Sequence, residues 1–350
     1  MEDPQETTFT TAPAFWHRID GGWVGLPAHR GALLIVPADE PLPEVFPVDA
    51  KLLDTAPPAA PDGHLALAGL RPDWTLSVMC HDKPVRLRCH IGGTDWLRQR
   101  LLPQAAFGDT AAAQNLDLAP MPCGGYAIWQ DGKAAATAGD PHELASELYG
   151  VLLQICLSPH AALLHLHAAS VVVNDRPLIL AAPSHGGKTT LAIALQARGA
   201  TLLSDDTIAI DATDCSLAAL PFGMRVRPNG WDLARAYLAD DIHNIRPGQN
   251  GDRMIAPRLS GKVALTAGPA AAVILMERQS PASDARAGVS RLTAAEGLMG
   301  LVACGASLGS DPDDVAARAL CDWANTMPFH WMTYDTPEQG ALIVETFAVR

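Results

Sequence analysis

The sequence predicts an α/β protein of two domains, a smaller β-rich α+β domain over residues 1–138 and a larger α/β domain over residues 139–350. Its 350 residues suit two domains of about 100–200 residues each. Prolines and glycines interrupt the first 60 residues, which favours short strands and loops over long helices. Residues 163–204 follow the order strand, turn, strand, glycine-rich loop, helix and strand, which is typical of a βαβ unit.

Two hairpins and a short helix are expected in the first domain. The apolar pattern predicts paired strands over residues 75–79 and 85–91, and a short helix over residues 95–102. The second hairpin covers residues 126–137. It turns at the Asp-Gly pair 131–132, a dipeptide that favours a tight turn between strands.

A helix is expected to begin the second domain. Asp140 suits the N-cap, Pro141 suits the first helical position, and Glu143 can complete a capping box. The apolar residues that follow predict a helix over residues 141–157. The domain boundary is therefore placed at residues 138–140.

A strand, a loop and a helix carry the most specific pattern in the chain. Residues 177–182 form an almost continuous apolar run, as expected for a strand covered on both faces of a sheet. The loop that follows ends in Gly-Lys-Thr at 187–189, the ending of a Walker A phosphate loop, although Ala182 replaces the first glycine of that motif. A helix is expected over residues 188–198, closed by Gly199.

These residue types suit phosphate binding. Small loop residues let backbone N–H groups surround phosphate oxygens, and the helix N-terminus adds favourable partial charge. Lys188 can reach the β- and γ-phosphates, and the hydroxyl of Thr189 can hold Mg²⁺. The expected nucleotide-binding residues are Ser184, His185, Gly186, Gly187, Lys188, Thr189 and Thr190. The alternative is an ordinary glycine-rich turn between a strand and a helix.

Two adjacent aspartates end the next strand, predicted over residues 201–204. Asp205 lies 17 residues after Lys188, and Asp206 follows it. In an open α/β sheet the carboxyl ends of the strands face the crevice that binds ligand. One carboxylate would hold Mg²⁺, and the other would accept the proton of an attacking hydroxyl. The alternative is a turn that carries two solvated aspartates.

Two histidines fall on the strand predicted over residues 163–173. His165 and His167 are two positions apart, so a continuous strand would turn both to one face. A functional role is expected for His167. The alternative is a packed or surface histidine.

A basic segment follows the aspartates. Residues 225–262 hold seven of the 25 Lys and Arg residues in a chain whose formal net charge is −13. An arginine of this segment could close over phosphate groups and stabilise charge in a transition state, with Arg253 as first choice and Arg258 as second. The alternative is a solvated loop with surface ion pairs.

The charge and the hydropathy exclude some partners. A net charge of −13 argues against nucleic acid and against an anionic membrane surface. No apolar run approaches the roughly 18 residues of a membrane-spanning helix, and the first residues lack the pattern of a secretory signal. A cytoplasmic protein is expected, and a homo-oligomer stays open.

Taken together, five segments resemble the catalytic core of HPr kinase/phosphorylase, and especially the HPr-kinase-like proteins found near peptide-modification genes, including lasso-peptide serine kinases. They are HAASV at 167–171, LILAAPS at 178–184, GKTTL at 187–191, RG at 198–199 and LSDD at 203–206. The likeness runs without gaps over residues 167–206 and extends loosely over 125–350. Residues 1–120 carry no such likeness.

The resemblance implies a P-loop kinase domain that uses ATP and Mg²⁺. It implies that Asp205 is the general base, that Asp206 holds Mg²⁺ together with Thr189, and that His167 supports the base. The expected reaction is transfer of the γ-phosphoryl group to a hydroxyl, foremost a serine of a protein or of the precursor of a ribosomally made modified peptide. The first domain would then recognise the substrate. A small-molecule kinase and a non-catalytic nucleotide-binding regulator are the alternatives.

Overall fold

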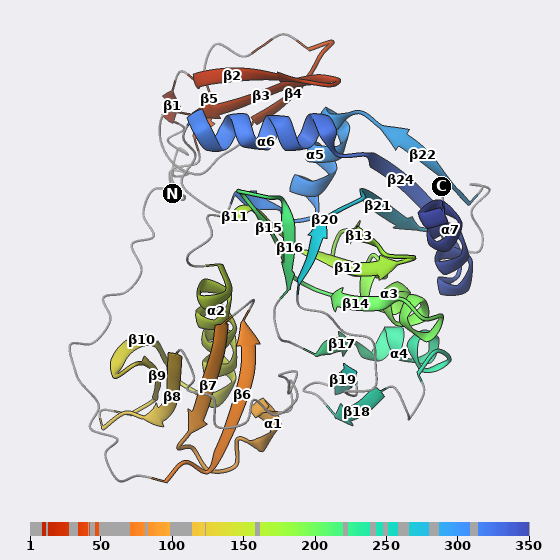
Figure 1. The fold of residues 1–350 in the computed structure, drawn as a ribbon. Coiled ribbons are helices and arrows are strands. Elements are labelled where there is room, and N and C mark those ends of the chain that lie inside the picture. The colour runs from red at the N-terminus through yellow and green to blue at the C-terminus, as the bar shows by residue number, and fades with distance from the viewer. Residues whose placement is uncertain are drawn as a thin grey trace, which may run out of the picture.

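The computed structural model is a mixed α/β protein with several sheets (Figure 1). It describes residues 9–11, 13–27, 34–40, 42, 46–48, 71–80, 83–98, 114–122, 124–157, 162–219, 223–238, 243–247, 251–257, 266–279, 287–308 and 314–349. Within these ranges the helices are α1 (Asp95–Arg98), α2 (Pro141–Leu157), α3 (Lys188–Ala197), α4 (Pro228–Arg235), α5 (Ala294–Ala303), α6 (Asp314–Thr326) and α7 (Pro337–Val349). None of these helices combines the length and the apolar composition that a bilayer crossing requires.

The strands of the described ranges are, in chain order, β1 (Phe9–Thr11), β2 (Pro13–Ile19), β3 (Gly22–Pro27), β4 (Leu34–Pro37), β5 (Phe46–Val48), β6 (Trp74–Cys80), β7 (Lys83–Cys89), β8 (Gln114–Pro120), β9 (Tyr126–Gln130), β10 (Lys133–Ala138), β11 (Ala162–Leu166), β12 (Ala168–Val173), β13 (Arg176–Ala181), β14 (Thr201–Ser204), β15 (Ile208–Asp211), β16 (Ser216–Ala219), β17 (Met224–Val226), β18 (His243–Pro247), β19 (Arg253–Pro257), β20 (Thr266–Pro269), β21 (Ala272–Arg278), β22 (Gly288–Leu292), β23 (Ser307–Leu308) and β24 (Phe329–Tyr334). They pair into sheets of the order β1-β5, β2-β3-β4, β10-β9-β8-β7-β6, β20-β16-β15-β11-β23, β14-β12-β13-β21-β24-β22 and β17-β19-β18.

The six-stranded sheet forms the centre of the carboxyl-terminal part. β13 is parallel to β21, and β21 is parallel to β24, whereas β12 lies antiparallel between β13 and β14. Leu178 and Leu180 of β13 belong to the core formed with α3 and α7, and Ile179 and Ala181 belong to the core formed with α5 and α6. The predicted burial of this strand on both faces is confirmed.

The strand predicted over residues 163–173 is wrong as a single element. The chain leaves one sheet after β11, which pairs with β15 and β23, and enters the six-stranded sheet at β12, with His167 between the two. Both segments are apolar because each is buried in its own sheet. A periodic apolar pattern cannot reveal such a change of sheet.

The first strands pack on the carboxyl-terminal part. β2, β3 and β4 contact α5 and α6, as Figure 1 shows at the top of the molecule. Ile19 and Val24 lie in the same core as Leu298 and Leu301 of α5. Residues far apart in the sequence therefore share one core, and part of the segment predicted as a separate first domain completes the second.

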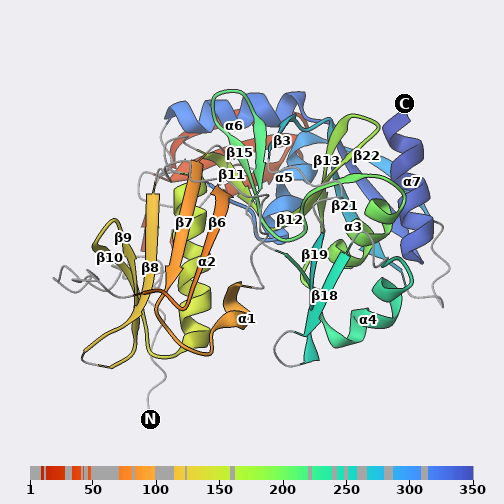
Figure 2. The ribbon, with the colours of Figure 1, turned by 60° about the horizontal axis from the view of Figure 1, so that its bottom comes forward.

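The sheet β6–β10 forms a core of its own with α2 (Figure 2). Leu144, Leu148 and Leu152 of α2 are buried with apolar residues of β6 to β9. The sequence-based boundary at 138–140 separates this helix from the sheet that it covers, so a division after α2 follows the two cores more closely. Beyond α1, the predicted helix 95–102 lies outside the described residues from 99 on.

Local signals set the start of α2 as predicted. The Asp140 carboxylate accepts hydrogen bonds from the backbone N–H groups of His142 (2.7 Å) and Glu143 (2.9 Å). Glu143 reaches back to the N–H of Gly139, one residue before the position of a standard capping box. These contacts satisfy donors that a helix leaves without intrahelical partners.

Replacing Leu148 by alanine should destabilise the protein by about 2–5 kcal/mol, because the side chain is fully buried between α2 and the sheet β6–β10. Urea unfolding followed by far-UV circular dichroism measures the change. The matched control is Ser146→Ala, which changes an exposed residue of the same helix and should stay within about 0.5 kcal/mol. A Leu148→Ala variant as stable as the control would contradict the packing described.

Candidate active site

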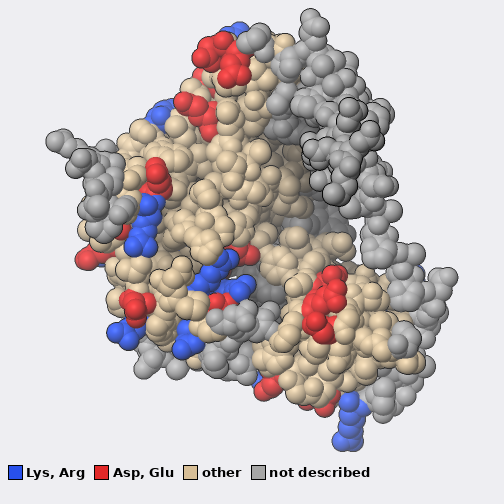
Figure 3. All heavy atoms as spheres, turned by 180° about the vertical axis from the view of Figure 1, so that it is seen from behind, with Lys and Arg blue, Asp and Glu red and all other residues tan. Residues whose placement is uncertain are grey.

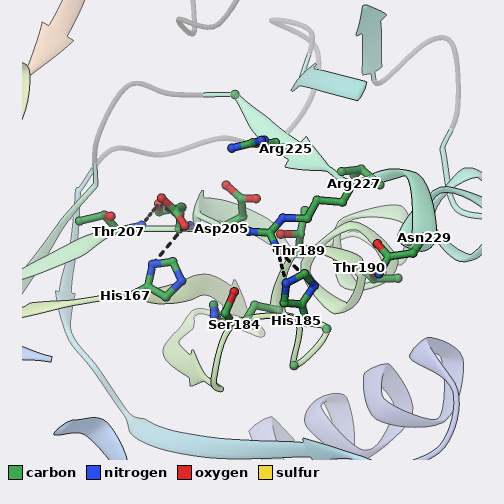
Figure 4. Close-up of a pocket in the computed structure, with 18 of the residues that line it drawn as sticks. His167, Ser184, His185, Thr189, Thr190, Asp205, Thr207, Arg225, Arg227 and Asn229 are labelled. Carbon is green, nitrogen blue, oxygen red and sulfur yellow. Dashed lines mark hydrogen bonds and ion pairs between the residues drawn. The ribbon is translucent and has the colours of Figure 1, made fainter. Parts of the chain in front are cut away.

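A pocket of about 350 Å³ opens at the carboxyl end of β13 (Figure 4). It draws on α2, on the loop before α3, on the turn after β14 and on the segment from β17 to α4. Its lining residues are Ala145, Tyr149, His167, Ser184, His185, Gly186, Gly187, Lys188, Thr189, Thr190, Ser204, Asp205, Asp206, Thr207, Gly223, Arg225, Val226, Arg227, Asn229, Gly230 and Arg278.

The loop 182–187 is tightly folded and needs its last two glycines. The N–H of Gly186 donates to the carbonyl of Pro183 (2.9 Å), and a Cβ at Gly186 would lie 2.5 Å from the Cβ of Ala182. Gly187 has φ = 87°, and a Cβ there would lie 2.8 Å from the hydroxyl of Tyr334. Gly186 therefore makes room for Ala182, which explains how this loop accommodates alanine at the first motif position.

The first turn of α3 faces the pocket. Gly187 is the N-cap of α3. Glycine has no side chain, so no side chain at the N-cap accepts a hydrogen bond from the first N–H groups of the helix. Together with the helix dipole, these N–H groups favour an anion at this point. Ser184, Thr189 and Thr190 line the same space.

His185 adopts a left-handed backbone conformation, with φ = 69°. Its ring contacts the guanidinium of Arg227, whose Nη1 lies 3.1 Å from Nδ1 of the histidine. Figure 4 shows Arg227 extended over the loop toward His185. The contact brings a cation next to the loop at the lining of the pocket.

Lys188 is folded onto the loop. Its ammonium donates to the carbonyls of Ala182 (2.8 Å) and Pro183 (3.4 Å), and the residue is only 7% exposed. Burial lowers the pKa of Lys188, whereas the nearby carboxylates of Asp206 and Asp205 favour the charged form. The lysine is thus held at the loop, next to the helix N-terminus.

Asp205 is a buried carboxyl group, 7% exposed. Burial raises the pKa of Asp205 to about 7, and the neighbouring charge of Asp206 adds to the shift. Hydrogen bonds from the Thr189 hydroxyl and from the backbone N–H of Arg225 act in the opposite direction. These contacts place Asp205 beside the first turn of α3.

Asp206 is the exposed member of the pair, with 56% of its side chain accessible. Its Oδ1 lies 3.1 Å from Nδ1 of His167, the contact drawn in Figure 4. The hydroxyl of Ser204 accepts hydrogen bonds from the N–H groups of Asp206 and Thr207, which fixes the turn. His167 is therefore paired with Asp206 and not, as the resemblance implied, with Asp205.

Arg253 does not line the pocket, so its expected closure over phosphate groups stays a prediction. Its guanidinium lies over the ring of Trp231 (5.6 Å to the ring centroid) and donates to the carbonyls of Gly251 and Asp252. The arginines that line the pocket are Arg225, Arg227 and Arg278. The second choice, Arg258, lies outside the described residues.

The structure thus brings together every predicted nucleotide-binding residue, the aspartate pair and His167, and it separates Arg253 from them. His165 does not line the pocket, because the change of sheet at His167 ends the shared face. Arg278 and Tyr149 are among the lining residues that were not predicted from the sequence. Arg278 could have been found as a charged residue that ends an apolar strand, whereas nothing local to the helix marks Tyr149.

Basic side chains gather beside a hollow near the middle of one face, as Figure 3 shows. Four cationic residues line the pocket, namely Lys188, Arg225, Arg227 and Arg278, against the two carboxyl groups of Asp205 and Asp206. In a chain of net charge −13 this local excess favours a polyanionic ligand.

The pocket also holds oxygen-bearing side chains that fit a hard cation bound together with phosphate. Asp205, Asp206 and the hydroxyl of Thr189 offer oxygen ligands, which Mg²⁺ prefers. Within the part of the chain that the structure describes, no cluster of three or more His, Cys, Asp or Glu residues could enclose a metal ion. Mg²⁺ keeps several waters and takes further ligands from a substrate's phosphates, so a few protein oxygens can hold it.

Comparisons with known proteins add little to this geometry. No model of a known protein family matches the chain, and no curated protein matches it. Among solved structures, the chain is similar to the Hpr(Ser) kinase/phosphatase from Coxiella burnetii, with a TM-score of 0.29, 12% sequence identity and coverage of 53% of this chain and 96% of that chain. A likeness of this degree assigns neither the fold nor the activity.

Replacing Asp205 by asparagine should stabilise the ligand-free protein at alkaline pH. The pKa of the Asp205 carboxyl is about 7 in the folded protein and 3.8 in the unfolded chain. The folded state therefore binds this proton more tightly than the unfolded state does. As the pH rises from about 4 to about 7, the folded protein loses stability. At about pH 8 the gain should be on the order of 1–3 kcal/mol, and near pH 4 it should vanish.

Thermal unfolding between about pH 4 and pH 8 measures this difference. Asp322→Asn is the control, because this aspartate is exposed on α6 and does not line the pocket, so its replacement should change the stability little. A ligand-free Asp205→Asn variant that is less stable than the wild type at pH 8 would show that the buried charge does not strain the site.

Proposed function

We propose that this protein is an ATP-dependent phosphotransferase that moves the γ-phosphoryl group of ATP to a hydroxyl, foremost a serine of a peptide or protein. One observation carries the proposal: a glycine-rich loop, a helix N-terminus, a lysine and two carboxyl groups line one pocket. Such a set serves phosphoryl transfer, in which the protein mainly positions the reactants and stabilises charge.

The triphosphate would lie along the loop 182–187 and the first turn of α3. Backbone N–H groups there donate to phosphate oxygens, and Lys188 would exchange its carbonyl partners for the β- and γ-phosphates. Arg225, Arg227 and Arg278 replace Arg253 as the candidates that stabilise charge on the transferred group.

The contacts of the two aspartates support an assignment opposite to the one that the resemblance implied. Asp205 accepts a hydrogen bond from Thr189, the residue expected at the metal, so Asp205 and Thr189 are the pair that would hold Mg²⁺. When bound, Mg²⁺ neutralises charge on the β- and γ-phosphates. Asp206 is exposed and oriented by His167, so it is the carboxylate that an acceptor hydroxyl can reach as it loses its proton.

A non-catalytic nucleotide-binding regulator is the second candidate. The contact between Arg227 and His185 favours it, since both side chains lie over the loop where phosphates would bind. A small-molecule kinase differs from the main proposal only in its acceptor. Formation of ADP from ATP, measured with candidate peptides, with small hydroxyl compounds and with neither, separates the three.

Lys188→Ala should weaken ATP binding about 10- to 100-fold while the protein stays folded, because the lysine supplies a charge-assisted contact worth about 1.5–3 kcal/mol. Isothermal titration calorimetry and thermal unfolding test both parts. Lys133→Ala, an exposed lysine of β10 outside the pocket, is the control and should bind as the wild type does. Equal ATP affinity in both variants would remove the phosphate-loop assignment.

The two aspartates should differ in binding and in turnover. Asp205→Asn should weaken the Mg²⁺-dependent part of ATP binding, because it removes a metal ligand. Asp206→Asn should keep that binding and lose about 10²- to 10⁴-fold in phosphoryl transfer, the usual contribution of a general base. Titration of ATP with and without Mg²⁺, together with transfer from radiolabelled ATP, measures both. If the two variants exchange these phenotypes, the assignment implied by the resemblance holds instead.

A further inference from the structure

Helix α2 lines the pocket although it belongs to the other core. Leu144, Leu148 and Leu152 anchor the helix on the sheet β6–β10, whereas Ala145 and Tyr149 line the pocket beside the aspartate pair. The pocket is therefore assembled from two separately packed parts of the chain. Any motion between these parts would change the surroundings of the aspartates.

Tyr149 is the side chain that joins the two parts at the site. Its hydroxyl and the hydroxyl of Thr207 are hydrogen-bonded to each other. The same Tyr149 oxygen lies 3.5 Å from Oδ2 of Asp206. The Tyr149 hydroxyl has donor geometry toward both oxygens but carries one proton, so it donates to the Asp206 carboxylate in the arrangement in which the Thr207 hydroxyl donates to Tyr149.

The two oxygens of Asp206 are thus approached from two sides. His167 lies 3.1 Å from Oδ1, and Tyr149 approaches Oδ2. Burial raises the pKa of the Tyr149 hydroxyl, so it stays protonated and able to donate at neutral pH. The exposed carboxylate would otherwise sample several rotamers.

We propose that Tyr149 is a positioning residue that orients Asp206 for phosphoryl transfer and makes this orientation depend on the docking of α2. The inference rests on the proposed function. Tyr149 acts through Asp206 and Thr207, so it does not bind the nucleotide. Its loss should leave ATP binding intact and slow the transfer step, because a small misplacement of a reacting group costs a large factor in rate.

The test uses the full chain and MgATP, with water as the acceptor, and follows phosphate release from radiolabelled ATP. Tyr149→Phe keeps the ring and removes the hydroxyl. It should lower kcat about tenfold and leave the KM for ATP unchanged, and the lost hydrogen bond should lower the thermal unfolding temperature only slightly. Tyr126→Phe, a tyrosine of β9 outside the pocket, is the matched control and should change neither constant.

A double-mutant cycle with Thr207→Val makes the test specific. If the two hydroxyls act as one hydrogen-bonded unit, the double variant should be about as slow as either single variant, so the effects are not additive. A merely structural role would lower the unfolding temperature and would give no such split between kcat and KM.

Two outcomes overturn the inference, and they are distinguishable. Wild-type protein that neither binds nor hydrolyses MgATP overturns the proposed function and the role of Tyr149 with it. Wild-type protein that turns over MgATP with an unchanged kcat in Tyr149→Phe, or with a raised KM at constant kcat, overturns only the positioning role.

Discussion

The shared direction of four strands in the central sheet determines where the site can form. β13, β21 and β24 run parallel, and β14 runs the same way because each of β13 and β14 is antiparallel to β12 between them. Their carboxyl ends therefore meet at one edge of the sheet. The loop 182–187 follows β13 and the aspartate pair follows β14, whereas Arg278 and Tyr334 are the last residues of β21 and β24. Tyr334 limits residue 187 to glycine. A register slip of one strand would remove its group from the site.

Burial at this edge creates electrostatic strain that a ligand can relieve. Asp205 is enclosed beside Asp206, and Lys188 is withdrawn from solvent onto two carbonyl groups. Burial disfavours the charged form of each residue. Under the proposed function, a polyanion bound with a divalent cation would supply opposite charge to both, so the empty protein would give up stability in favour of binding. Such a conflict between stability and chemistry is common at functional sites.

The contribution of the N-terminal residues to the site is indirect and twofold. The strands β2 and β3 pack in one core with α5 and α6. Helix α2 packs in a second core and also lines the pocket. The aspartate turn lies where the two parts meet through Tyr149 and Thr207. Under the proposed function, a substrate bound at the sheet β6–β10 would have a direct structural route to Asp206.

Local physics determined much of this protein from the sequence alone. The cap at Asp140, the turn at Asp131-Gly132, the doubly buried strand β13 and the loop before Lys188 depend on neighbours within a few residues, so spacing and residue type predict them. Only the tertiary structure decided the long-range partners. In the structure His167 pairs with Asp206, Arg253 lies over Trp231, and Tyr149 and Arg278 line the pocket. These pairings join residues from different sheets and cores, and no local pattern encodes the relative placement of two packed elements.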